Sequence, residues 1–484
     1  MILSLAIKPK KRDSTLSDVK NMSYILNESI ALRSWWRVPY AYYVKGIHNA
    51  QKLTKEEFEL LSRCDGESEI EDSELLDSLI ERRLAFECKK GERSLSPWQR
   101  MECDNRYFPA MNWMITGKCN YNCLHCFNAA DNSPLMDEFS LEEAERLMDE
   151  AMACGINAFT ITGGEPMCHK SFLPIIEGIY RRGMYVEELN TNGFYINQEL
   201  LDRMKEIGCD PLMKISFDGI GHHDWLRNRK GAEEDALRAI ALCIKNGFRV
   251  KVQTNVHRRN IDSMLDTVRL LDKMGVSETR IIRTSEAPRW NENAVGATLD
   301  LEEYFDRMLD FCRAYSLEEH NMTVDVWQFM IVRPKSKSYA LRSVSYCEGN
   351  FKESMPVCRG NRAMIAVAAN GNVFPCLQMS GYYESRKDVL GNVKESGLRP
   401  ILQMGKYLAE VCTTVGELAE ANAECRECPY FKYCAGGCRA IALALTSDKM
   451  GIDPLKCLFY KKGYYRKVTE AMGDWHNSSP LPIE

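Results

Sequence analysis

Three cysteines lie within eight positions of the sequence, in the stretch KCNYNCLHC. Three residues separate Cys119 from Cys123, and two separate Cys123 from Cys126. Thiolates are the soft ligands that iron-sulfur clusters and zinc prefer, and this close spacing lets one loop surround a compact metal centre. A structural zinc site needs four protein ligands, and His125 is the nearby candidate for a fourth. Three thiolates instead predict a four-iron cluster with one iron open to a small molecule.

The overall composition narrows the choice of partners and compartment. The chain has 484 residues, 20 cysteines, a formal net charge of −5 and a pI near 6.0. Without an excess of positive charge, no nucleic acid partner is expected. The first apolar run is too short for a signal peptide and no run spans a membrane, so we expect a cytoplasmic protein without a membrane partner. Cytoplasmic thiols stay reduced, so these cysteines indicate metal binding or catalysis rather than disulfides.

Residues 106–315 alternate strand-like and helix-like patterns. Strand-then-helix repeats favour a parallel α/β sheet, either an open barrel of βα units or a doubly wound sheet. In both folds the loops at the carboxyl ends of the strands carry the chemistry, and KCNYNCLHC directly follows the first strand. The six predicted strands are MNWMIT (111–116), NAFTIT (157–162), YVEELNT (185–191), LMKISFD (212–218), RVKVQTNV (249–256) and TRIIRTS (279–285).

Two further regions flank this repeat. Residues 1–105 combine an aromatic block suited to strands with short helical segments, which predicts a small α+β module like a winged helix. Its aromatic side chains are expected in the core rather than in a binding groove. Residues 316–346 are expected to link the repeat to a cysteine-rich region, 347–484, in which two short strands flank the turn ANGN at 369–372.

The repeat resembles the core of the radical S-adenosylmethionine (SAM) superfamily. The signature Cys-x3-Cys-x2-Cys after the first barrel strand matches Cys119, Cys123 and Cys126. The resemblance implies a partial (β/α)6 barrel, similar to an incomplete TIM barrel, in which SAM chelates the open iron and yields a 5′-deoxyadenosyl radical that abstracts hydrogen. The SAM-binding residues that it implies are Gly163, Gly164 and Glu165 of TITGGEP, Asn192 of NTNG, and Ser216, Asp218 and Arg227 in and after ISFDG.

The residue types suit these implied roles. Glycines let the main chain approach a ligand, Glu165 adds an acceptor for an ammonium, and the fork of Arg227 suits a carboxylate. Taken singly, each motif fits an ordinary turn or a surface arginine equally well. The adjacent His222 and His223 are expected to be loop residues. Spacing identifies no general base, so no catalytic residue is assigned.

The cysteine-rich region resembles the SPASM extension of this superfamily, which carries two auxiliary iron-sulfur clusters. Three 4Fe-4S clusters are therefore expected in total, with a zinc ribbon in CRECPYFKYCAGGC as the alternative. If Cys347 does not bind, one auxiliary cluster keeps an open iron for a substrate thiolate. The remaining cysteines are expected to be small buried apolar residues. The resemblance implies one cluster on Cys425, Cys428, Cys434 and Cys457, and another on Cys358, Cys376, Cys438 and, less constantly, Cys347.

The amino-terminal module is similar to the peptide-recognition element fused to many maturases of ribosomally made peptides. The resemblance implies a radical SAM maturase that installs a thioether or carbon-carbon crosslink in a precursor peptide, whose leader pairs with an edge strand. Flavodoxin or ferredoxin is the implied electron donor. The alternative is a sulfatase-maturating, formylglycine-forming enzyme, although Leu377 stands where that family has an acidic base. A dehydrogenase, an epimerase and a non-enzymatic zinc-binding scaffold also remain open.

Overall fold

The computed structural model describes residues 22–126, 136–284, 288–345 and 350–479. Contacts divide the chain into two units, Met1–Asp104 and Asn105–Glu484, and each unit has a hydrophobic core of its own. Among the residues described, no helix is long and apolar enough to cross a membrane.

The amino-terminal unit combines two small sheets with two short helices. One sheet pairs β1 (Met22–Leu26) with β5 (Ala85–Lys89), and the other has the order β4-β3-β2-β6. Helix α1 begins with a capping box, in which Thr54 and Glu57 each bond the other's backbone N–H. The other elements are β2 (Ile30–Trp36), β3 (Val38–Val44), β4 (Gln51–Lys52), α1 (Lys55–Ser62), α2 (Glu74–Glu81) and β6 (Arg100–Arg106).

The aromatic block of this unit divides between core and surface. Trp35 and Tyr43 are buried and meet edge to face, with 5.5 Å between ring centres. Trp36, the next residue, is 46% exposed because successive side chains of a strand point to opposite faces. Only some of these aromatic side chains therefore lie in the core as expected.

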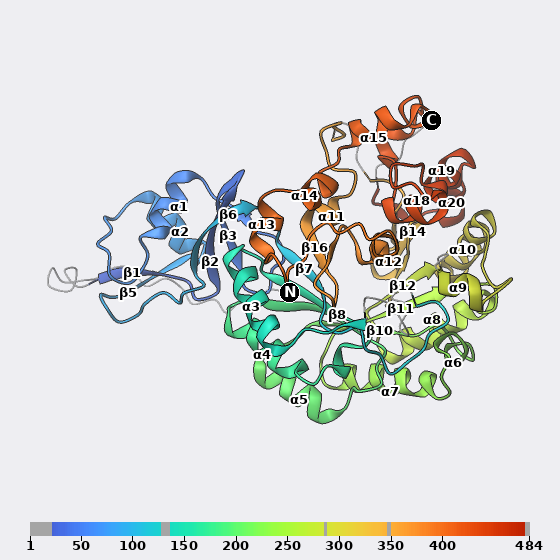
Figure 1. The fold of residues 1–484 in the computed structure, drawn as a ribbon, viewed down its shortest axis with the longest axis horizontal. Helices are drawn as coiled ribbons and strands as arrows, with labels where there is room; N and C mark the ends of the chain where they lie inside the picture. The colour runs from blue at the N-terminus through green and yellow to red at the C-terminus, as the bar shows by residue number, and fades with distance from the viewer. Residues whose placement is uncertain (1–21, 127–135, 285–287, 346–349, 480–484) are drawn as a thin grey trace. The chain divides into compact units, whose positions relative to one another are not determined.

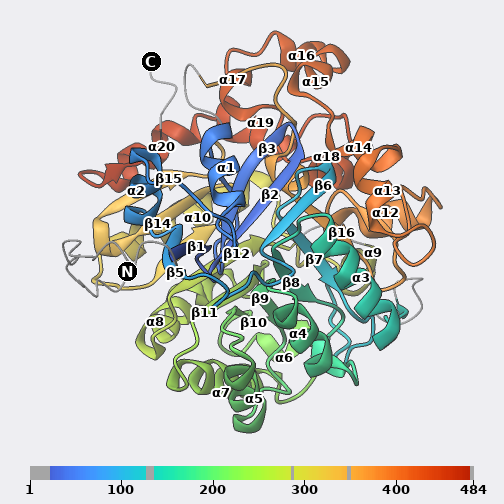
Figure 2. The same ribbon diagram turned by 90° about the vertical axis from the view of Figure 1, so that its left-hand side faces the viewer.

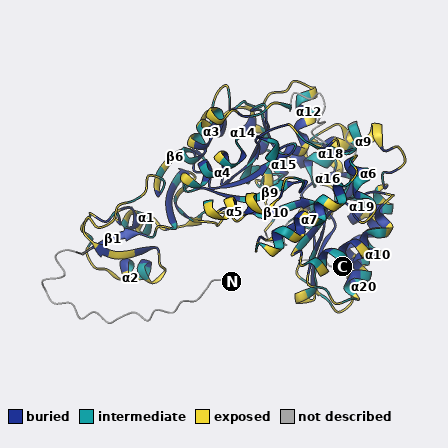
Figure 3. Ribbon diagram, turned by 90° about the horizontal axis from the view of Figure 1, so that it is seen from below, coloured by how far each residue is buried: buried dark blue, intermediate teal, exposed yellow. Residues whose placement is uncertain are grey.

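A twelve-stranded sheet organises the second unit. Six of its strands, β7 to β12, lie side by side in chain order and pair in parallel, which confirms the predicted βα repeat and the partial-barrel fold. Helices α3, α4, α5 and α7 lie around the outside of these strands (Figures 1 and 2), and Figure 3 shows buried strands beside helices with exposed outer faces. The strands are β7 (Ala110–Met114), β8 (Ala158–Thr162), β9 (Tyr185–Thr191), β10 (Leu212–Ser216), β11 (Val250–Val256) and β12 (Glu278–Arg283).

The helices between these strands bury one face each. In α3, Ala144, Leu147 and Met148 are buried on the face that packs against the sheet, and Ser140 caps the first turn. The helices of this part are α3 (Leu141–Ala153), α4 (Phe172–Arg181), α5 (Gln198–Ile207), α6 (His223–Arg227), α7 (Ala232–Lys245), α8 (Met264–Met274), α9 (Pro288–Asn293) and α10 (Leu301–Ser316).

The segment 316–346, expected only as a linker, extends the sheet. Strand β13 (Thr323–Val326) adds in parallel to β12, and β14 (Met330–Arg333) and β15 (Ser338–Leu341) continue the sheet in antiparallel order. The buried carboxylate of Asp325 lies 3.0 Å from Arg280 and 2.7 Å from Arg342. These strands are short and depend on such contacts between distant residues. The local sequence pattern therefore did not predict them.

The cysteine-rich region returns to the first strand of the barrel. Strand β16 (Met364–Val367) pairs in parallel with β7, and β17 (Val373–Phe374) pairs with β16, so the predicted hairpin around 369–372 is confirmed. This pairing brings the region beside the loop that follows β7. Its helices, with the last strand, are α11 (Arg359–Ala363), α12 (Ser380–Ser385), α13 (Leu398–Gln403), α14 (Lys406–Val411), α15 (Val415–Ala421), α16 (Ala423–Arg426), α17 (Phe431–Cys434), α18 (Arg439–Thr446), α19 (Pro454–Lys461), α20 (Tyr464–Met472) and β18 (His476–Asn477).

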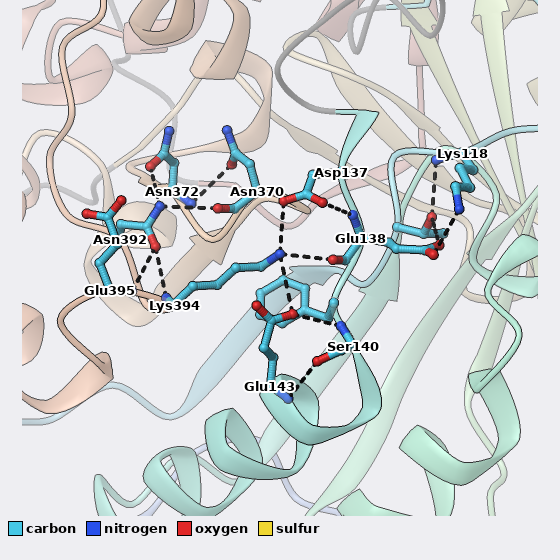
Figure 4. A network of polar contacts seen from close by, with 12 residues as sticks. Lys118, Asp137, Glu138, Ser140, Glu143, Asn370, Asn372, Asn392, Lys394 and Glu395 are labelled. Carbon is cyan, nitrogen blue, oxygen red and sulfur yellow. Dashed lines mark hydrogen bonds and ion pairs between the residues drawn. The ribbon is translucent and has the colours of Figure 1, made fainter.

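Lys394 holds the cysteine-rich region against the start of α3 (Figure 4). Its ammonium lies 3.0 Å from the carboxylate of Asp137 and 3.6 Å from that of Glu143, and it donates to the carbonyl of Glu138 at 2.9 Å. The side-chain amide oxygen of Asn392 accepts the backbone N–H of Lys394 at 2.8 Å and fixes its position. One cation thus joins segments that are far apart in sequence.

The segment held by Lys394 also supports the cysteine loop. The backbone N–H of Gly117 donates to the carbonyl of Asp137 at 2.8 Å, and Lys118 forms an ion pair with Glu138 at 2.8 Å. Cys119 follows immediately. The position of the cysteine loop is therefore coupled to the contact made by Lys394.

The substitution Lys394→Met tests this coupling. It keeps the aliphatic stem but leaves two carboxylates without their cation, and the expected loss of stability is about 1–2 kcal/mol, between the values for exposed and buried ion pairs. Amides of residues 137–143 should exchange faster in hydrogen-exchange mass spectrometry. Lys406→Met, at an exposed position of α14, is the matched control and should change nothing. Unchanged exchange over 137–143 in Lys394→Met would contradict the coupling.

Candidate functional site

The three cysteines of the first motif lie on the loop after β7, at the carboxyl end of the parallel strands. They share one apolar cluster, in which Cys119 and Cys126 pack against buried Cys123 and Tyr121. Burial raises the pKa of Cys119 to about 12. A thiol there remains protonated unless a metal replaces its proton, as thiolate ligation requires.

The donor set fits a cluster better than it fits a single ion. The thiols interact electrostatically with one another, and Arg227 Nη1 lies 3.9 Å from the sulfur of Cys123. In the part of the chain that the structure describes, no three His, Cys, Asp or Glu side chains converge closely enough to hold one metal ion. Thiolates that surround a cluster need not converge on one point. A guanidinium beside the sulfur offsets the negative charge of such a group.

His125 lies between the second and third cysteines. Burial, followed by the charge of Arg227, lowers the pKa of His125 to about 3, so the ring is neutral. Its Nε2 lies 3.2 Å from the side-chain nitrogen of Asn255, and its buried Nδ1 has no hydrogen-bond partner among the described residues. The zinc alternative would need this ring as its fourth ligand, and Nδ1 is the nitrogen that could serve, since Nε2 is directed at Asn255.

Gly163 and Gly164 are fixed by contact with the cysteine loop. A Cβ on Gly163 would lie 2.5 Å from the carbonyl oxygen of Thr116, and one on Gly164 would lie 2.4 Å from the carbonyl oxygens of Gly117 and Lys118. The N–H of Gly164 also donates to the carbonyl of Thr116 at 2.8 Å. The glycines were expected to admit a ligand, and what the structure shows is the close approach of two loops that only glycine permits.

Glu165 joins the loop after β8 to the loop after β9. Its buried carboxylate accepts hydrogen bonds from the hydroxyl of Thr191 at 2.9 Å and from the N–H groups of Asn192 at 2.8 Å and Met167 at 3.4 Å. Burial outweighs these bonds and raises the pKa of Glu165 to about 7. The side chain of Asn192 in turn donates to Asn120 of the cysteine loop at 2.8 Å. Glu165, expected to accept an ammonium, thus binds the neighbouring loop.

Asp218 lies at the centre of a buried ionic group after β10, whose last residue is Ser216. Its carboxylate accepts Nε–H of Arg227 at 2.7 Å and the N–H of Asn255 at 2.9 Å, and it lies 2.9 Å from Nδ1 of His223. Burial opposes ionisation, but Arg227 and His223 hold the pKa of Asp218 well below its usual range. His223 is not a loop residue as expected: it begins helix α6 and is fully buried.

Arg227 connects this ionic group to the cysteines. Both residues were expected to bind SAM, and the structure pairs Arg227 with Asp218, because buried opposite charges require partners. Sequence reasoning also missed Arg289 of α9, whose Nε donates to the carbonyl of Cys123 at 2.9 Å. No motif surrounds Arg289, so only its position in space identifies it.

The cysteines of the third region gather into two groups. Thiols within each group interact electrostatically. Burial raises the pKa values of Cys376, Cys425, Cys434, Cys438 and Cys457, that of Cys438 to about 12. The structure thus brings together the cysteines expected to share each cluster, except Cys347, which lies outside the described residues. The first auxiliary group is Cys358, Cys376 and Cys438, and the second auxiliary group is Cys425, Cys428, Cys434 and Cys457.

The surroundings of both groups suit sulfur ligands. Backbone N–H groups of Asn361 and Gly436 point at Cys358 at 3.5 Å and at Cys434 at 3.4 Å. Such bonds are among the factors that set cluster potentials. A cavity beside Cys358 is also lined by Asn361 and Arg439. Of the remaining cysteines, Cys154, Cys243 and Cys312 are fully buried as expected, whereas Cys168 and Cys412 are only half-buried.

The substitution Glu165→Gln removes one titration from this site. Folded Glu165 has a pKa of about 7 against a reference value of 4.5, so wild-type stability falls as the pH rises through this window and levels off above it. From pH 5 to pH 8 the unfolding free energy of the variant should therefore gain about 2–3 kcal/mol relative to wild type. Chemical unfolding across that range measures the gain. Glu177→Gln, at a partly exposed position of α4 beside Arg203, is the control. A stability difference between Glu165→Gln and wild type that does not change with pH would refute the raised pKa of Glu165.

Two segments match known families, one described as the radical SAM superfamily (residues 113–271) and one as the SPASM iron-sulfur cluster-binding domain (residues 358–429). An AdoMet-dependent heme synthase of Methanosarcina barkeri is 27% identical over 72% of this chain and 95% of its own. A PqqA peptide cyclase of Granulibacter bethesdensis is 24% identical over 74% of this chain and 90% of its own.

A solved structure, Streptococcus suis SuiB bound to precursor peptide SuiA, shares the fold with a TM-score of 0.62 and 13% identity, covering 90% of this chain and 99% of that one. The matched segments carry the first cysteine motif and four of the auxiliary cysteines, Cys358, Cys376, Cys425 and Cys428. The expected identification is therefore confirmed: this protein is an enzyme with a radical SAM core and a SPASM iron-sulfur domain.

Proposed function

We propose that this protein is a radical SAM peptide maturase that installs a thioether or carbon-carbon crosslink in a ribosomally made precursor peptide. The observation that carries the proposal is the separate amino-terminal unit, Met1–Asp104, which precedes the radical SAM segment. A unit with its own core and sheets is suited to binding a peptide apart from the reacting centre. The similarity in fold to SuiB, solved with its precursor peptide, and the relationship to a PqqA peptide cyclase support this reading.

Under this proposal, each residue of the site has a role. Cys119, Cys123 and Cys126 hold a 4Fe-4S cluster, which together with bound SAM supplies a 5′-deoxyadenosyl radical. Arg227 offsets charge at Cys123, and the remaining proposed SAM-site residues position the loops around it. The auxiliary groups hold two further 4Fe-4S clusters, with Cys347 as fourth ligand of the first. The SAM-site residues are Gly163, Gly164, Glu165, Asn192, Ser216, Asp218 and Arg227.

The peptide leader is proposed to bind along β3. Strand β3 is next to the sheet edge, and its outer neighbour β4 has only two residues. Tyr40 of β3 packs on Phe58 of α1, with 5.6 Å between ring centres, and both rings are partly exposed. An extended leader would add main-chain hydrogen bonds at this edge and place apolar side chains against these rings. Reduced flavodoxin or ferredoxin is the proposed electron donor in the cytoplasm.

A second candidate is chemistry on a tetrapyrrole. It is favoured by the relationship to AdoMet-dependent heme synthases, 27–29% identical over 71–72% of this chain. Formylglycine formation is less well supported, because Leu377, beside Cys376, is buried among apolar side chains and offers no group to take a proton. Dehydrogenation or epimerisation of a peptide would use the same site.

The first test concerns the cluster. Anaerobically reconstituted wild type should release 5′-deoxyadenosine from SAM when given dithionite, and the triple substitution of Cys119, Cys123 and Cys126 by alanine should abolish the release. The triple variant should keep the iron of both auxiliary clusters, about eight atoms per chain. Matched alanine substitutions at Cys154, Cys243 and Cys312 are the control. Equal release by the triple variant and wild type would refute the assignment.

The second test concerns the substrate. Short peptides encoded beside the gene should give a product lighter by two hydrogens, while porphyrins should be returned unchanged. Tyr40→Asp should weaken binding of the leader and slow turnover by about an order of magnitude or more, because it removes one ring of the proposed contact and places a charge beside Phe58. Phe86→Asp, at an exposed position of β5, is the matched control. A porphyrin product with no peptide product would favour the second candidate instead.

A further inference from the structure

Helix α19 carries a lysine that is buried between the two auxiliary groups. Lys456 is only 6% exposed. Its ammonium donates to the hydroxyl of Ser345 at 2.8 Å, and that hydroxyl donates to the carbonyl of Cys434 at 3.2 Å. The charge of Lys456 interacts with Cys434 of the second auxiliary group, with the buried carboxylate of Asp453, and with Cys438 and Cys358 of the first group. One cation therefore lies within reach of both groups.

Asp453 fixes the position of this lysine. One carboxylate oxygen accepts the N–H groups of Leu455 at 3.0 Å and Lys456 at 3.2 Å, which starts α19. The other accepts the N–H of Cys438 at 2.7 Å, which starts α18. A Cβ at Gly437 would lie 2.4 Å from this carboxylate, so no larger residue fits between the two helix starts. A single buried side chain thus sets the spacing between Lys456 and one cysteine of the first auxiliary group.

A second buried cation nearby, Arg439, also interacts with cysteines of both groups, but backbone carbonyls hold its guanidinium. Arg439 donates from Nη1 to the carbonyls of Lys449 at 2.9 Å and Gly451 at 2.7 Å, and from Nη2 to the carbonyl of Gly436. The ammonium of Lys456 has one hydrogen bond to a neutral hydroxyl. A buried charge held by so little is costly unless negative groups surround it. Asp453 is one such group, and thiolates bound to iron would supply further negative charge on the side of both auxiliary groups.

We propose that Lys456 is a counter-cation shared by the two auxiliary clusters and that it raises the reduction potential of both. The inference rests on the proposed binding of clusters by these cysteines. Reduction adds one negative charge to a cluster, and a nearby cation in a medium of low dielectric constant stabilises the reduced form more than the oxidised form. Lys456 therefore acts on electron transfer through the clusters, without contact with the substrate.

A redox titration followed by EPR spectroscopy tests this inference on the full reconstituted chain. In Lys456→Met both auxiliary couples should shift to lower potential, while the couple of the SAM-binding cluster should stay in place. Lys456→Arg keeps the charge and should retain potentials near those of wild type. Lys462→Met removes a half-exposed lysine at the end of the same helix and is the matched control. Iron content and circular dichroism accompany each variant, and Lys456→Gln replaces the methionine variant if the latter fails to assemble.

The possible outcomes separate the inference from the proposed function. Unchanged auxiliary potentials in a fully loaded Lys456→Met or Lys456→Gln protein would overturn the inference and leave the proposed cluster ligands intact. A shift in the reduction potential of only one auxiliary cluster would contradict the proposal that Lys456 acts on both. Wild-type protein that assembles no auxiliary clusters would overturn the ligand assignment itself, and the inference with it. An equal shift in Lys456→Arg would show that shape rather than charge is responsible.

Discussion

Buried charge requires a partner, and this constraint shapes every part of the site. Asp218 is fully buried beside Arg227, which extends to the sulfur of Cys123, so the charge of one loop is balanced by another. Lys394 likewise pairs with a carboxylate where the cysteine-rich region meets α3. The same constraint draws attention to Lys456, which is buried near the auxiliary groups. The cysteine loop is thus held by charge pairs that come from several βα units.

The second organising feature is the close contact between successive loops. Gly164 lies against the backbone of the cysteine loop, Glu165 binds the loop after β9, and Asn192 of that loop returns to Asn120. Parallel pairing puts these loops together at the carboxyl ends of the strands. Small or hydrogen-bonding residues then let neighbouring loops contact one another directly. Several residues expected to contact SAM therefore also build the surface that would receive it.

The relatives divide between tetrapyrrole and peptide chemistry, and the shared core does not distinguish them. Function has to be argued from the parts that differ, because one fold supports many reactions. Here the proposed function rests on the amino-terminal unit, which precedes the matched radical SAM segment, with its nearly open β3 edge and partly exposed aromatic rings. The cysteine-rich region contains a further feature, a buried lysine near two groups of thiols.

The sequence by itself determined the six parallel strands, the hairpin at 369–372 and the cysteine motifs, because these depend on local periodicity and spacing. It did not reveal strands β13 to β15, the burial of His223 beside Asp218, or Arg289 beside Cys123, since each depends on contacts between residues far apart in the chain. The order and spacing of the residues thus predicted that the donors at the site are thiolates. Which charges face those ligands was decided only when the loops packed together, because burial and pairing of charge are properties of the folded chain.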